Sequence, residues 1–381
     1  MDAIWALGLM SGTSFDGIDA ALVKTDGVGL EAFGPGGAFD YAPGEMDAAR
    51  AVHADWRPFR RAAAGGDAAA TLAQAGREVD AAHAAASARL LARAEAAEAL
   101  PEIVGYHGQT VAHGPDDPAG GWTWQLGDGA ALARALNRTV AWDFRCADVT
   151  AGGQGAPLAP FYHFALARAL GRGPVCFLNL GGVGNVSWAD PEAAGPEAPG
   201  ALVGFDTGPA NALVDDWMRA RTGQSCDRDG AAAAAGRVHV DRLRRNSIEA
   251  FVARRPPKSL DRNEFVQALE AMQGLSTEDG AATLTALSAI CAAGAQAHLP
   301  RPAATWILCG GGRLNPTLAA MIAERVEAEV IPAEAAGLDG DLLEAQCFAY
   351  LAVRALRGLP LSAPGTTGVP RPLTGGRISR P

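Results

Sequence analysis

The sequence lacks the features that mark membrane, secreted and nucleic-acid-binding proteins. Across its 381 residues no run approaches ~20 apolar residues free of charge or glycine, so we expect no transmembrane span and no membrane partner. The opening Met1-Asp2-Ala3 carries no basic segment before the first apolar run, so we expect no secretion signal. A net charge of -10 argues against nucleic acid as a partner, because such a surface needs clustered Lys and Arg.

Paired cysteines are also missing. The six cysteines are scattered and form no CxxC pair, so we expect reduced, mostly buried thiols in a cytoplasmic protein; they are Cys146, Cys176, Cys226, Cys291, Cys309 and Cys347. His107 and His113 have no further His, Cys or carboxylate at ligand spacing, so we expect no transition-metal site there.

The chain does contain enough apolar residues for two domains. Hydrophobic residues make up 49% of the sequence, which supports a core in each of two domains of ordinary size. Strands interleaved with helices occur in two successive series, which predicts an α/β architecture with two lobes. We expect an N-terminal lobe over residues 1–150, joined by the C-terminal segment 338–381, and a C-terminal lobe over residues 151–337.

The first series opens on a predicted hairpin, with strands at Ile4–Met10 and Ile18–Lys24. Alanine-rich helices are expected at Met46–Ala64 and Ala68–Ala99. From Ile103 the pattern changes to short apolar runs separated by glycines, through WQLGDG and VAWDF to the loop TAGGQGAPLAP.

The second series predicts strands and helices at Cys176–Leu180, Asn185–Ala189, Ala201–Asp206, Ala210–Arg221, Thr277–His298, Ala304–Leu308 and Pro316–Val326. Between them, Asp227–Pro257 is expected to form polar helices over the second lobe. A last helix at Leu342–Arg357 precedes a tail from Pro360, which we expect to be an irregular, partly mobile extension.

Four glycine-rich turns follow predicted strands: Ser11–Gly17, Gly152–Gly155, Gly181–Gly184 and Gly310–Gly312. Glycines let backbone N–H groups point into one hollow and let an anion approach without a Cβ in the way. Each turn alone could merely reverse the chain, but four in one α/β chain favour a nucleotide cleft. Neither GxxxxGK[ST] nor GxGxxG occurs, so a different scheme for binding phosphate is needed.

Asp206 is the candidate catalytic residue. It is predicted to end a strand just before a helix whose first turn Pro209 could start, so it could act as a general base or as a helix cap. The flanking Gly204 and Gly208 leave the backbone around it thin, which favours chemistry.

Arg145 also follows a predicted strand. Its guanidinium could hold a carboxylate or phosphate in a bidentate manner, or form an internal pair with Asp143 or Asp148. His107-Gly108-Gln109-Thr110 is expected to hydrogen bond a polar ligand.

The chain resembles the anhydro-N-acetylmuramic acid kinase family. The matching blocks run in one order through nearly the whole chain: MSGTSFDGID, YHGQTVAHGP, WQLGD, GGQGAPLAP, FLNLGGVGNVS, GFDTGPANALVD, PPKSLDRNEF, CGGGRLNP and EAQ. The resemblance implies two ribonuclease-H-like lobes, as in the sugar kinase, Hsp70 and actin superfamily, with an ATP and sugar cleft between them. It implies conversion of 1,6-anhydro-N-acetylmuramic acid, ATP and water into N-acetylmuramic acid 6-phosphate and ADP, in peptidoglycan recycling.

The resemblance also implies roles for individual residues. The contacts to ATP would come from Gly12, Thr13, Ser14, Phe15, Asp16, Gly17, Ile18 and Asp19, with Gly181, Gly182, Thr207 and Gly208, and near the nucleoside from Gly310, Gly311 and Gly312. Asp206 would be the base that activates water, Arg145 would hold the lactyl carboxylate or position the ring, and Glu344 would bind sugar hydroxyls. The cofactors would be ATP and Mg²⁺, and the family suggests a homodimer.

Two departures from the family pattern leave roles open. Many superfamily members have an aspartate at the start of the first phosphate loop, where this chain has Leu9-Met10, so Asp16 and Asp19 are only candidate Mg²⁺ ligands. The stretch Lys258–Arg262 lacks the glycine expected before the arginine.

Two alternative functions remain open from the sequence. A kinase for another anhydro sugar, such as levoglucosan, would share the fold and the base but would not need a cationic group for a lactyl carboxylate. A non-catalytic ATP-binding module would keep the glycine loops but would have no use for Asp206 or Arg145.

Overall fold

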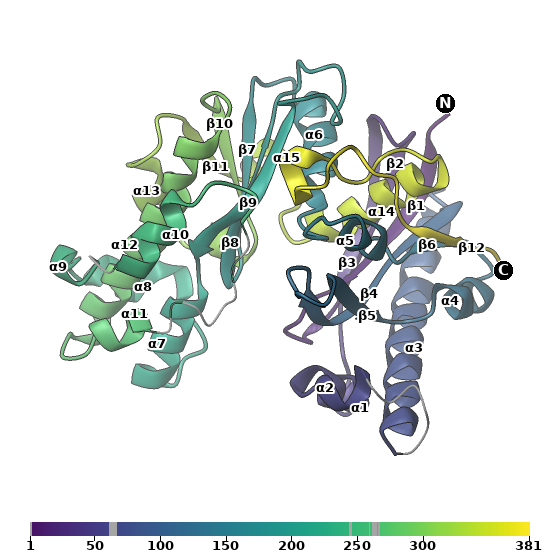
Figure 1. Cartoon of the computed structure of the whole chain (residues 1–381), viewed down its shortest axis with the longest axis horizontal. Helices are drawn as coiled ribbons and strands as arrows, with labels where there is room; N and C mark the ends of the chain where they lie inside the picture. Colours follow the sequence, from purple (N-terminus) through teal and green to yellow (C-terminus); the bar gives the residue numbers. More distant parts are fainter. Residues whose placement is uncertain (1, 61–66, 244–245, 259, 261–264, 266) are drawn as a thin grey trace. The chain divides into compact units, whose positions relative to one another are not determined.

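The computed structural model describes residues 2–60, 67–243, 246–258, 260, 265 and 267–381 (Figure 1). The chain divides into two compact units: unit 1 is Met1–Ala165 with Leu342–Pro381, and unit 2 is Leu166–Asp341. Both have mixed α/β structure built on one sheet each. The boundaries expected from the sequence, after residues 150 and 337, lie at the ends of a short helix and of a 3₁₀ turn, whereas the units divide after Ala165 and Asp341.

Unit 1 is built on a seven-stranded sheet in the order β12-β6-β4-β1-β2-β3, with β5 paired to β4. The strands are β1 (Ile4–Ser11), β2 (Gly17–Thr25), β3 (Leu30–Asp40), β4 (Ile103–Gly114), β5 (Trp122–Leu126), β6 (Thr139–Trp142) and β12 (Arg377–Ser379). β1, β2 and β3 form an antiparallel meander, and β4 and β6 continue the sheet in parallel on the other side of β1. This is the strand order of a ribonuclease-H-like lobe.

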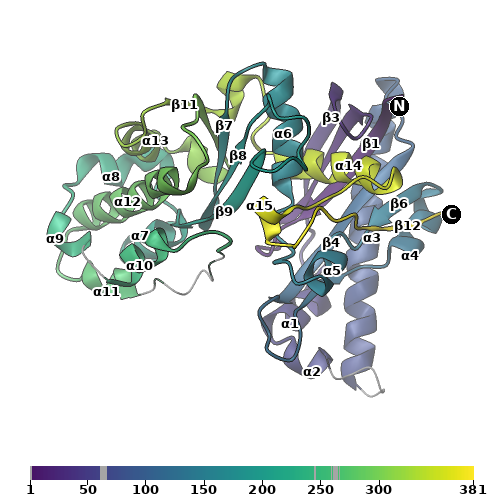
Figure 2. The ribbon, with the colours of Figure 1, turned by 45° about the horizontal axis from the view of Figure 1, so that its top comes forward.

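Helices cover both faces of this sheet. They are α1 (Asp47–Ala54), α2 (Arg57–Arg60), α3 (Asp67–Ala96), α4 (Gly129–Leu136), α5 (Cys146–Thr150), α6 (Ala159–Leu170, which continues into unit 2), α14 (Leu343–Leu356) and α15 (Pro364–Thr367). Leu7 and Leu9 of β1 share a buried cluster with α3, whereas the intervening Gly8 contacts α14. Because successive strand residues point to opposite faces, α3 and α14 lie on opposite sides of the sheet (Figures 1 and 2).

Two glycines allow α14 to lie directly on the sheet. Gly8 of β1 pairs with Gly105 of β4, and a Cβ at either would overlap the α14 backbone, at Ala345 O and Phe348 O respectively. The close approach fixes the N-terminal turn of α14, and with it Glu344, against the sheet.

Unit 2 has a five-stranded sheet in the order β11-β10-β7-β8-β9. The strands are β7 (Val175–Leu180), β8 (Val183–Ala189), β9 (Leu202–Pro209), β10 (Thr305–Cys309) and β11 (Glu329–Pro332). β7, β8 and β9 form an antiparallel meander, and β10 and β11 continue in parallel beside β7. The order therefore repeats that of unit 1, and the predicted pair of ribonuclease-H-like lobes is confirmed.

The helices of unit 2 form a second, mainly helical core beside the sheet core. They are α7 (Ala212–Thr222), α8 (Ala231–Ala235), α9 (Val240–Leu243), α10 (Asn246–Ala253), α11 (Gln267–Ala271), α12 (Thr277–Gly294) and α13 (Pro316–Ala323), with 3₁₀ turns η2 (Arg228–Gly230), η3 (Ala295–His298), η4 (Gly311–Leu314) and η5 (Ala333–Ala336). Within the described ranges, only Thr277–His298 is long and apolar enough to cross a membrane, and 78% of its 18-residue window is buried, as in the core helix of a globular domain.

Several sequence predictions are wrong in detail. The helix expected over Met46–Ala64 is divided: α1 ends at Ala54, and α2 begins at Arg57 with Pro58 in its first turn, where the missing N–H has no helical partner to lose. Residues 61–64 lie outside the described residues. Strands β3 and β11 were not predicted. The tail from Pro360 is tied down rather than loose, since β12 pairs antiparallel with β6, and Thr367 is fully buried. Gly152–Gly155 follows helix α5, not a strand.

Candidate functional site

The first glycine loop, residues 12–16, is the turn between β1 and β2 in unit 1. Thr13, Ser14 and Asp16 are exposed at its tip. Phe15 has a left-handed backbone with φ of 58°, and its N–H donates to Gly12 O at 3.3 Å. The Phe15 ring is buried against His53, 5.2 Å between centroids. The tip of the loop therefore presents two hydroxyls and a carboxylate, and the buried Phe15 ring anchors the loop.

The base of this loop is fastened to the neighbouring strand and helix. Gln109 Nε2 donates to Gly12 O at 3.0 Å, and Ser11 Oγ donates to Gly108 O at 3.1 Å. Arg50 Nη2 donates to Phe15 O at 2.5 Å. Gln109, expected to contact substrate, is fully buried, and among the described residues its Oε1 has no hydrogen-bond partner.

Four of the residues expected to contact ATP offer little or no side-chain surface to a ligand. Phe15 and Ile18 belong to the unit 1 core, and Ile18 pairs with Ser11 across the hairpin. Gly17 lies against Phe39 O, so the hairpin needs a residue without a Cβ there. Asp19 lies within β2 and is half-buried. Any contact from Phe15, Gly17 or Ile18 to a ligand would come from the backbone.

Arg145 forms the centre of a second polar cluster in unit 1. It is the N-cap residue of α5, three residues after β6 ends. Its Nη1 donates to Gly155 O at 2.8 Å, while Nε and Nη2 lie 3.3 and 3.1 Å from His107 Nε2. The alternative of an internal pair with Asp148 is not realised, because that carboxylate accepts from Gly155 N and Thr367 Oγ1, both at 2.6 Å.

His107 is kept neutral by its surroundings. Burial, with the adjacent Arg145 charge, holds the pKa of His107 well below its usual value. A neutral ring that accepts from Arg145 at Nε2 carries its proton on Nδ1, and this buried atom has no partner in the part of the chain that is described. The neutral His107 ring thus orients the Arg145 guanidinium without placing a second positive charge beside it.

Glu344 approaches the same cluster from helix α14. It lies in the first turn, is solvent-exposed, and interacts electrostatically with Arg145. One turn further along, Phe348 packs on the His107 ring at 4.7 Å between centroids. The structure therefore brings together three residues predicted to contact substrate: His107, Arg145 and Glu344.

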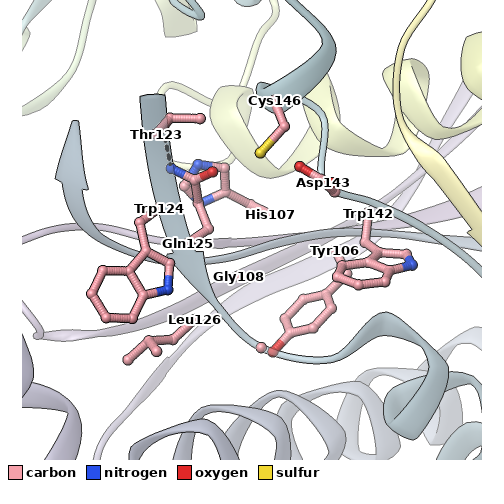
Figure 3. Close-up of a pocket in the computed structure, with 11 residues that line it drawn as sticks. Tyr106, His107, Gly108, Thr123, Trp124, Gln125, Leu126, Trp142, Asp143 and Cys146 are labelled. Atoms are coloured by element: carbon pink, nitrogen blue, oxygen red, sulfur yellow. Dashed lines mark hydrogen bonds between the residues drawn. The ribbon is translucent and has the colours of Figure 1, made fainter. Parts of the chain in front are cut away.

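A small pocket of about 130 Å³ opens beside His107 (Figure 3). It is lined by Tyr106, His107, Gly108, Thr123, Trp124, Gln125, Leu126, Gly127, Trp142, Asp143 and Cys146, from β4, β5, β6 and the start of α5. Burial and the neighbouring Asp143 raise the pKa of the Cys146 thiol to about 12, so it is protonated at neutral pH. The volume suits one substituent of a ligand rather than a whole nucleotide.

Two glycine loops meet at one end of the unit 2 sheet. Gly181 and Gly182 form the β7–β8 turn, and their carbonyls accept from the start of α7, with Asn211 N–H to Gly181 O at 2.9 Å. Gly310 follows β10, the parallel neighbour of β7, and has φ of 68°. Gly311 is exposed with open space beside it, whereas Gly312 packs on Leu180. Carboxyl ends of parallel strands are where α/β sheets bind ligands.

Arg313 fixes the second of these loops and was missed by the sequence analysis. Its side chain is 3% exposed and is ion-paired with Glu334 and Asp341, each at 2.8 Å. Its Nη1 also donates to Gly310 O at 3.1 Å. An arginine directly after three glycines is the only signal that the sequence offered.

Asp206 lies inside strand β9 rather than at its end, which corrects the sequence prediction. β9 continues to Pro209, and α7 begins only at Ala212, so Asp206 does not cap that helix. The pairing of β8 with β9 shifts between Gly184 and Asn185, leaving Thr207 as the extra residue of a bulge. Bulges re-aim side chains beside functional sites.

The carboxylate of Asp206 has a raised pKa. Burial raises it to about 6, against the opposing effects of the Leu260 N–H and the Lys258 charge. Asp206 Oδ2 accepts from Leu260 N at 2.8 Å. Within the described ranges no hydrogen bond to Oδ1 occurs. A carboxylate ionised at neutral pH with one free oxygen can accept a proton.

Thr207 and Gly208, which are expected to contact ATP, are both buried. Thr207 is 2% exposed, and Gly208 has φ of 149° with Cys291 where a Cβ would lie, so packing constrains both positions. Of the stretch Lys258–Arg262, residues 259, 261 and 262 lie outside the described residues.

Comparison with known proteins shows the family of the chain. The chain matches the family described as anhydro-N-acetylmuramic acid kinase over residues 4–380. A protein of that name from Cereibacter sphaeroides is 55% identical over 380 residues, covering 100% of this chain and 97% of the relative. Anhydro-N-acetylmuramic acid kinase 1 from Jannaschia sp. is 49% identical over 381 residues, covering 99% and 96%.

Among solved structures, component A of (R)-2-hydroxyglutaryl-CoA dehydratase from Acidaminococcus fermentans superposes with a TM-score of 0.46 at 13% identity, covering 92% of this chain and 98% of that one. With the match spanning nearly every residue and relatives near half identical, the chain belongs to the anhydro-N-acetylmuramic acid kinase family.

Proposed function

We propose that this protein opens 1,6-anhydro-N-acetylmuramic acid with water and transfers the γ-phosphoryl group of ATP to O6, a transferase reaction of peptidoglycan recycling. The products are N-acetylmuramic acid 6-phosphate and ADP. Family membership over residues 4–380 supports the reaction class, and Asp206 is the observation that carries the mechanism.

Asp206 is proposed as the general base. Water must lose a proton as its oxygen attacks C1 and the C1–O6 bond breaks. O6 then bonds to the γ-phosphorus as the bond from that phosphorus to the β–γ bridging oxygen breaks and ADP leaves. A carboxylate with a pKa of about 6 is ionised at pH 7 and close enough to that pH to take the proton efficiently. The Leu260 N–H holds Oδ2, which leaves Oδ1 to face the water.

The glycine loops are proposed to bind ATP. The 12–16 loop offers the Thr13 and Ser14 hydroxyls, and the Gly181-Gly182 turn and Gly310-Gly311 offer accessible backbone. Phosphoryl transfer relies on positioned donors rather than on covalent chemistry by the protein.

Mg²⁺ would neutralise charge on the phosphates when bound. No group of three or more His, Cys, Asp or Glu that could hold a metal occurs in the part of the chain described. Mg²⁺ bound to a nucleotide usually takes one or two carboxylates, phosphate oxygens and water, so the exposed Asp16 or the neighbouring Asp19 fits that need.

Arg145 is proposed to bind the lactyl carboxylate of the sugar. Three of its five N–H groups are used by His107 and Gly155, which leaves the others for a carboxylate. Glu344 would accept hydrogen bonds from sugar hydroxyls. A cytoplasmic location and a homodimer stay predictions from the resemblance.

The test is an assay of the purified protein for ADP release and N-acetylmuramic acid 6-phosphate. Asp206→Asn should lose roughly 10²-fold or more in kcat, as expected when a general base is removed. Levoglucosan, which lacks the lactyl group, should be a poor substrate at saturating ATP. Full activity in Asp206→Asn would remove Asp206 as the base, and equal use of levoglucosan would favour the broader anhydro-sugar kinase.

A further inference from the structure

Two residues distant from β9 in the sequence, Lys258 and Leu260, hydrogen bond to Asp206 through their backbone groups. The Asp206 N–H donates to Lys258 O at 3.1 Å, and the Leu260 N–H donates to Asp206 Oδ2 at 2.8 Å. Lys258 therefore holds the backbone of the proposed base, and Leu260 holds its carboxylate. A group that fixes Lys258 in place helps to fix the position of Asp206.

The side chain of Lys258 anchors this residue to helix α10. It is 5% exposed, and its Nζ donates to Phe251 O and Val252 O, both at 3.0 Å. These carbonyls belong to the last turn of α10, where helical acceptors lack partners within the helix and favour a cation. The ammonium also lies over the rings of Phe205 and Phe251, at 5.3 and 4.8 Å from their centroids.

The presence of lysine here is unusual for this chain. The printed sequence contains two lysines, Lys24 and Lys258, among 32 basic side chains, and all the others are arginine. Lys24 forms an exposed ion pair with Glu31. At position 258 the compact ammonium lies near two carbonyls and two aromatic rings.

Resting on the proposed function of Asp206, we propose that Lys258 is a positioning residue for that base. Its ammonium anchors the Lys258 residue whose carbonyl accepts from the Asp206 N–H, and its charge favours the ionised form of the Asp206 carboxylate. Lys258 is not proposed to contact the substrate.

The charges around Lys258 support this role. Burial lowers the pKa of Lys258 to about 8, with Arg254 acting in the same direction and Cys291 and Asp206 opposing it. The Cys291 thiol, with a pKa of about 12, is neutral at pH 8. His298 Nε2 lies 2.8 Å from Val252 O and so shares one acceptor with Lys258.

These two pKa values define a pH range in which both side chains are charged. Asp206 is ionised above about pH 6, and Lys258 is charged below about pH 8. The profile of kcat/KM against pH should therefore rise near 6 and fall near 8.

The kinetic test compares three variants with the wild-type enzyme. Lys258→Met removes the charge and should raise the acid midpoint of kcat/KM by about 0.5 to 1 pH unit, with loss of the basic limb. Lys258→Arg keeps a charge at all relevant pH values, so it should retain the acid midpoint and lose the basic limb. Lys24→Met, the matched control, should leave the profile unchanged. A Lys258→Met profile that superposes on the wild type after normalisation would overturn the proposal.

A second measurement does not depend on activity or on a Lys258 variant. Lysine labelled with ¹³C at Cε should give two side-chain signals, and Lys24→Met assigns them by removing one. The Lys258 signal should titrate near pH 8, and in Asp206→Asn its midpoint should fall, because the anion that favours the ammonium is gone. An unchanged midpoint in Asp206→Asn would refute the coupling. Absence of turnover in the wild type would instead refute the proposed function.

Discussion

The two units share one strand order but place their chemistry differently. In unit 1 the β1–β2 turn is five residues long and exposes hydroxyls, whereas in unit 2 the matching β7–β8 turn is only Gly181-Gly182. The third strand differs more: β3 is an ordinary sheet edge, but β9 carries Asp206, which hydrogen bonds to Lys258 and Leu260. One scaffold therefore supplies equivalent positions in both units, and loop and edge residues decide which of these positions are suited to chemistry.

Glycine also serves different purposes in the two units. Gly8 and Gly105 lie side by side in the middle of the unit 1 sheet, where α14 presses on the backbone. In unit 2 the pair three residues before the end of β7 is Phe177 opposite Ile307, both buried. The exposed glycines of unit 2 lie instead at strand ends, beside open space. Packing explains the first group, and ligand access is proposed for the second.

The largest effect that would test this contrast is expected for Gly105→Ala. The added Cβ would overlap Phe348 O, so α14 would have to move off the sheet. We expect a loss of more than about 3 kcal/mol in the free energy of unfolding, measured by urea denaturation. The displaced α14 would also carry Glu344 and Phe348 away from Arg145 and His107.

Gly76→Ala is the matched control for that substitution. Gly76 lies inside helix α3 with nothing within 4 Å of an added Cβ. Alanine should therefore stabilise the protein by about 0.5 to 1 kcal/mol, through helix propensity and a less flexible unfolded chain. Equal destabilisation by both substitutions would show that packing against α14 is not what position 105 requires.

The second prediction concerns the stability cost of the base in β9. Burial raises the folded-state pKa of Asp206 from 3.8 to about 6, so the folded protein loses stability as pH rises from 3.8 through 6. Asp206→Asn removes the charge and can still accept from Leu260 N–H. It should be more stable than the wild type by about 2 to 3 kcal/mol above pH 6.5, with the difference vanishing below about pH 4.

Thermal melts across this pH range check that prediction. An Asp206→Asn protein that is inactive and more stable at pH 7 would mark β9 as a strand adapted for chemistry at the expense of folding. If the stability difference were the same at pH 4 and pH 7, the burial of the charge would not be its source.

What the sequence could reveal follows from how local each feature is. MSGTSFDG and GFDTGP are contiguous, so the loop and the acid were found directly. The β1–β2 hairpin was also predicted, because its apolar strand patterns and its turn residues lie in one continuous stretch of sequence. Strand β3 was missed because Gly34-Pro35-Gly36-Gly37 interrupts its pattern, and only pairing with β2 makes it a strand.

Features that depend on distant contacts could not be predicted. The position of Asp206 within β9 depends on a bulge opposite Gly184. The hydrogen bond that holds its carboxylate comes from the backbone of Leu260, 54 residues away. The tail is ordered because Thr367 bonds Asp148 across 219 residues. Sequence patterns report local periodicity, whereas each of these contacts arises from tertiary packing.

The smallest effect on folding is expected for Gly311→Ala, which tests the second half of the glycine contrast. Gly311 is exposed, has no positive φ, and nothing lies within 4 Å of an added Cβ. Stability should therefore change by no more than about 0.5 kcal/mol. If the residue is glycine because a nucleotide approaches its backbone, ATP should bind at least about tenfold more weakly, as measured by calorimetry. Unchanged affinity would place the nucleotide away from η4, and a large loss of stability would mean that this glycine, like Gly105, serves packing.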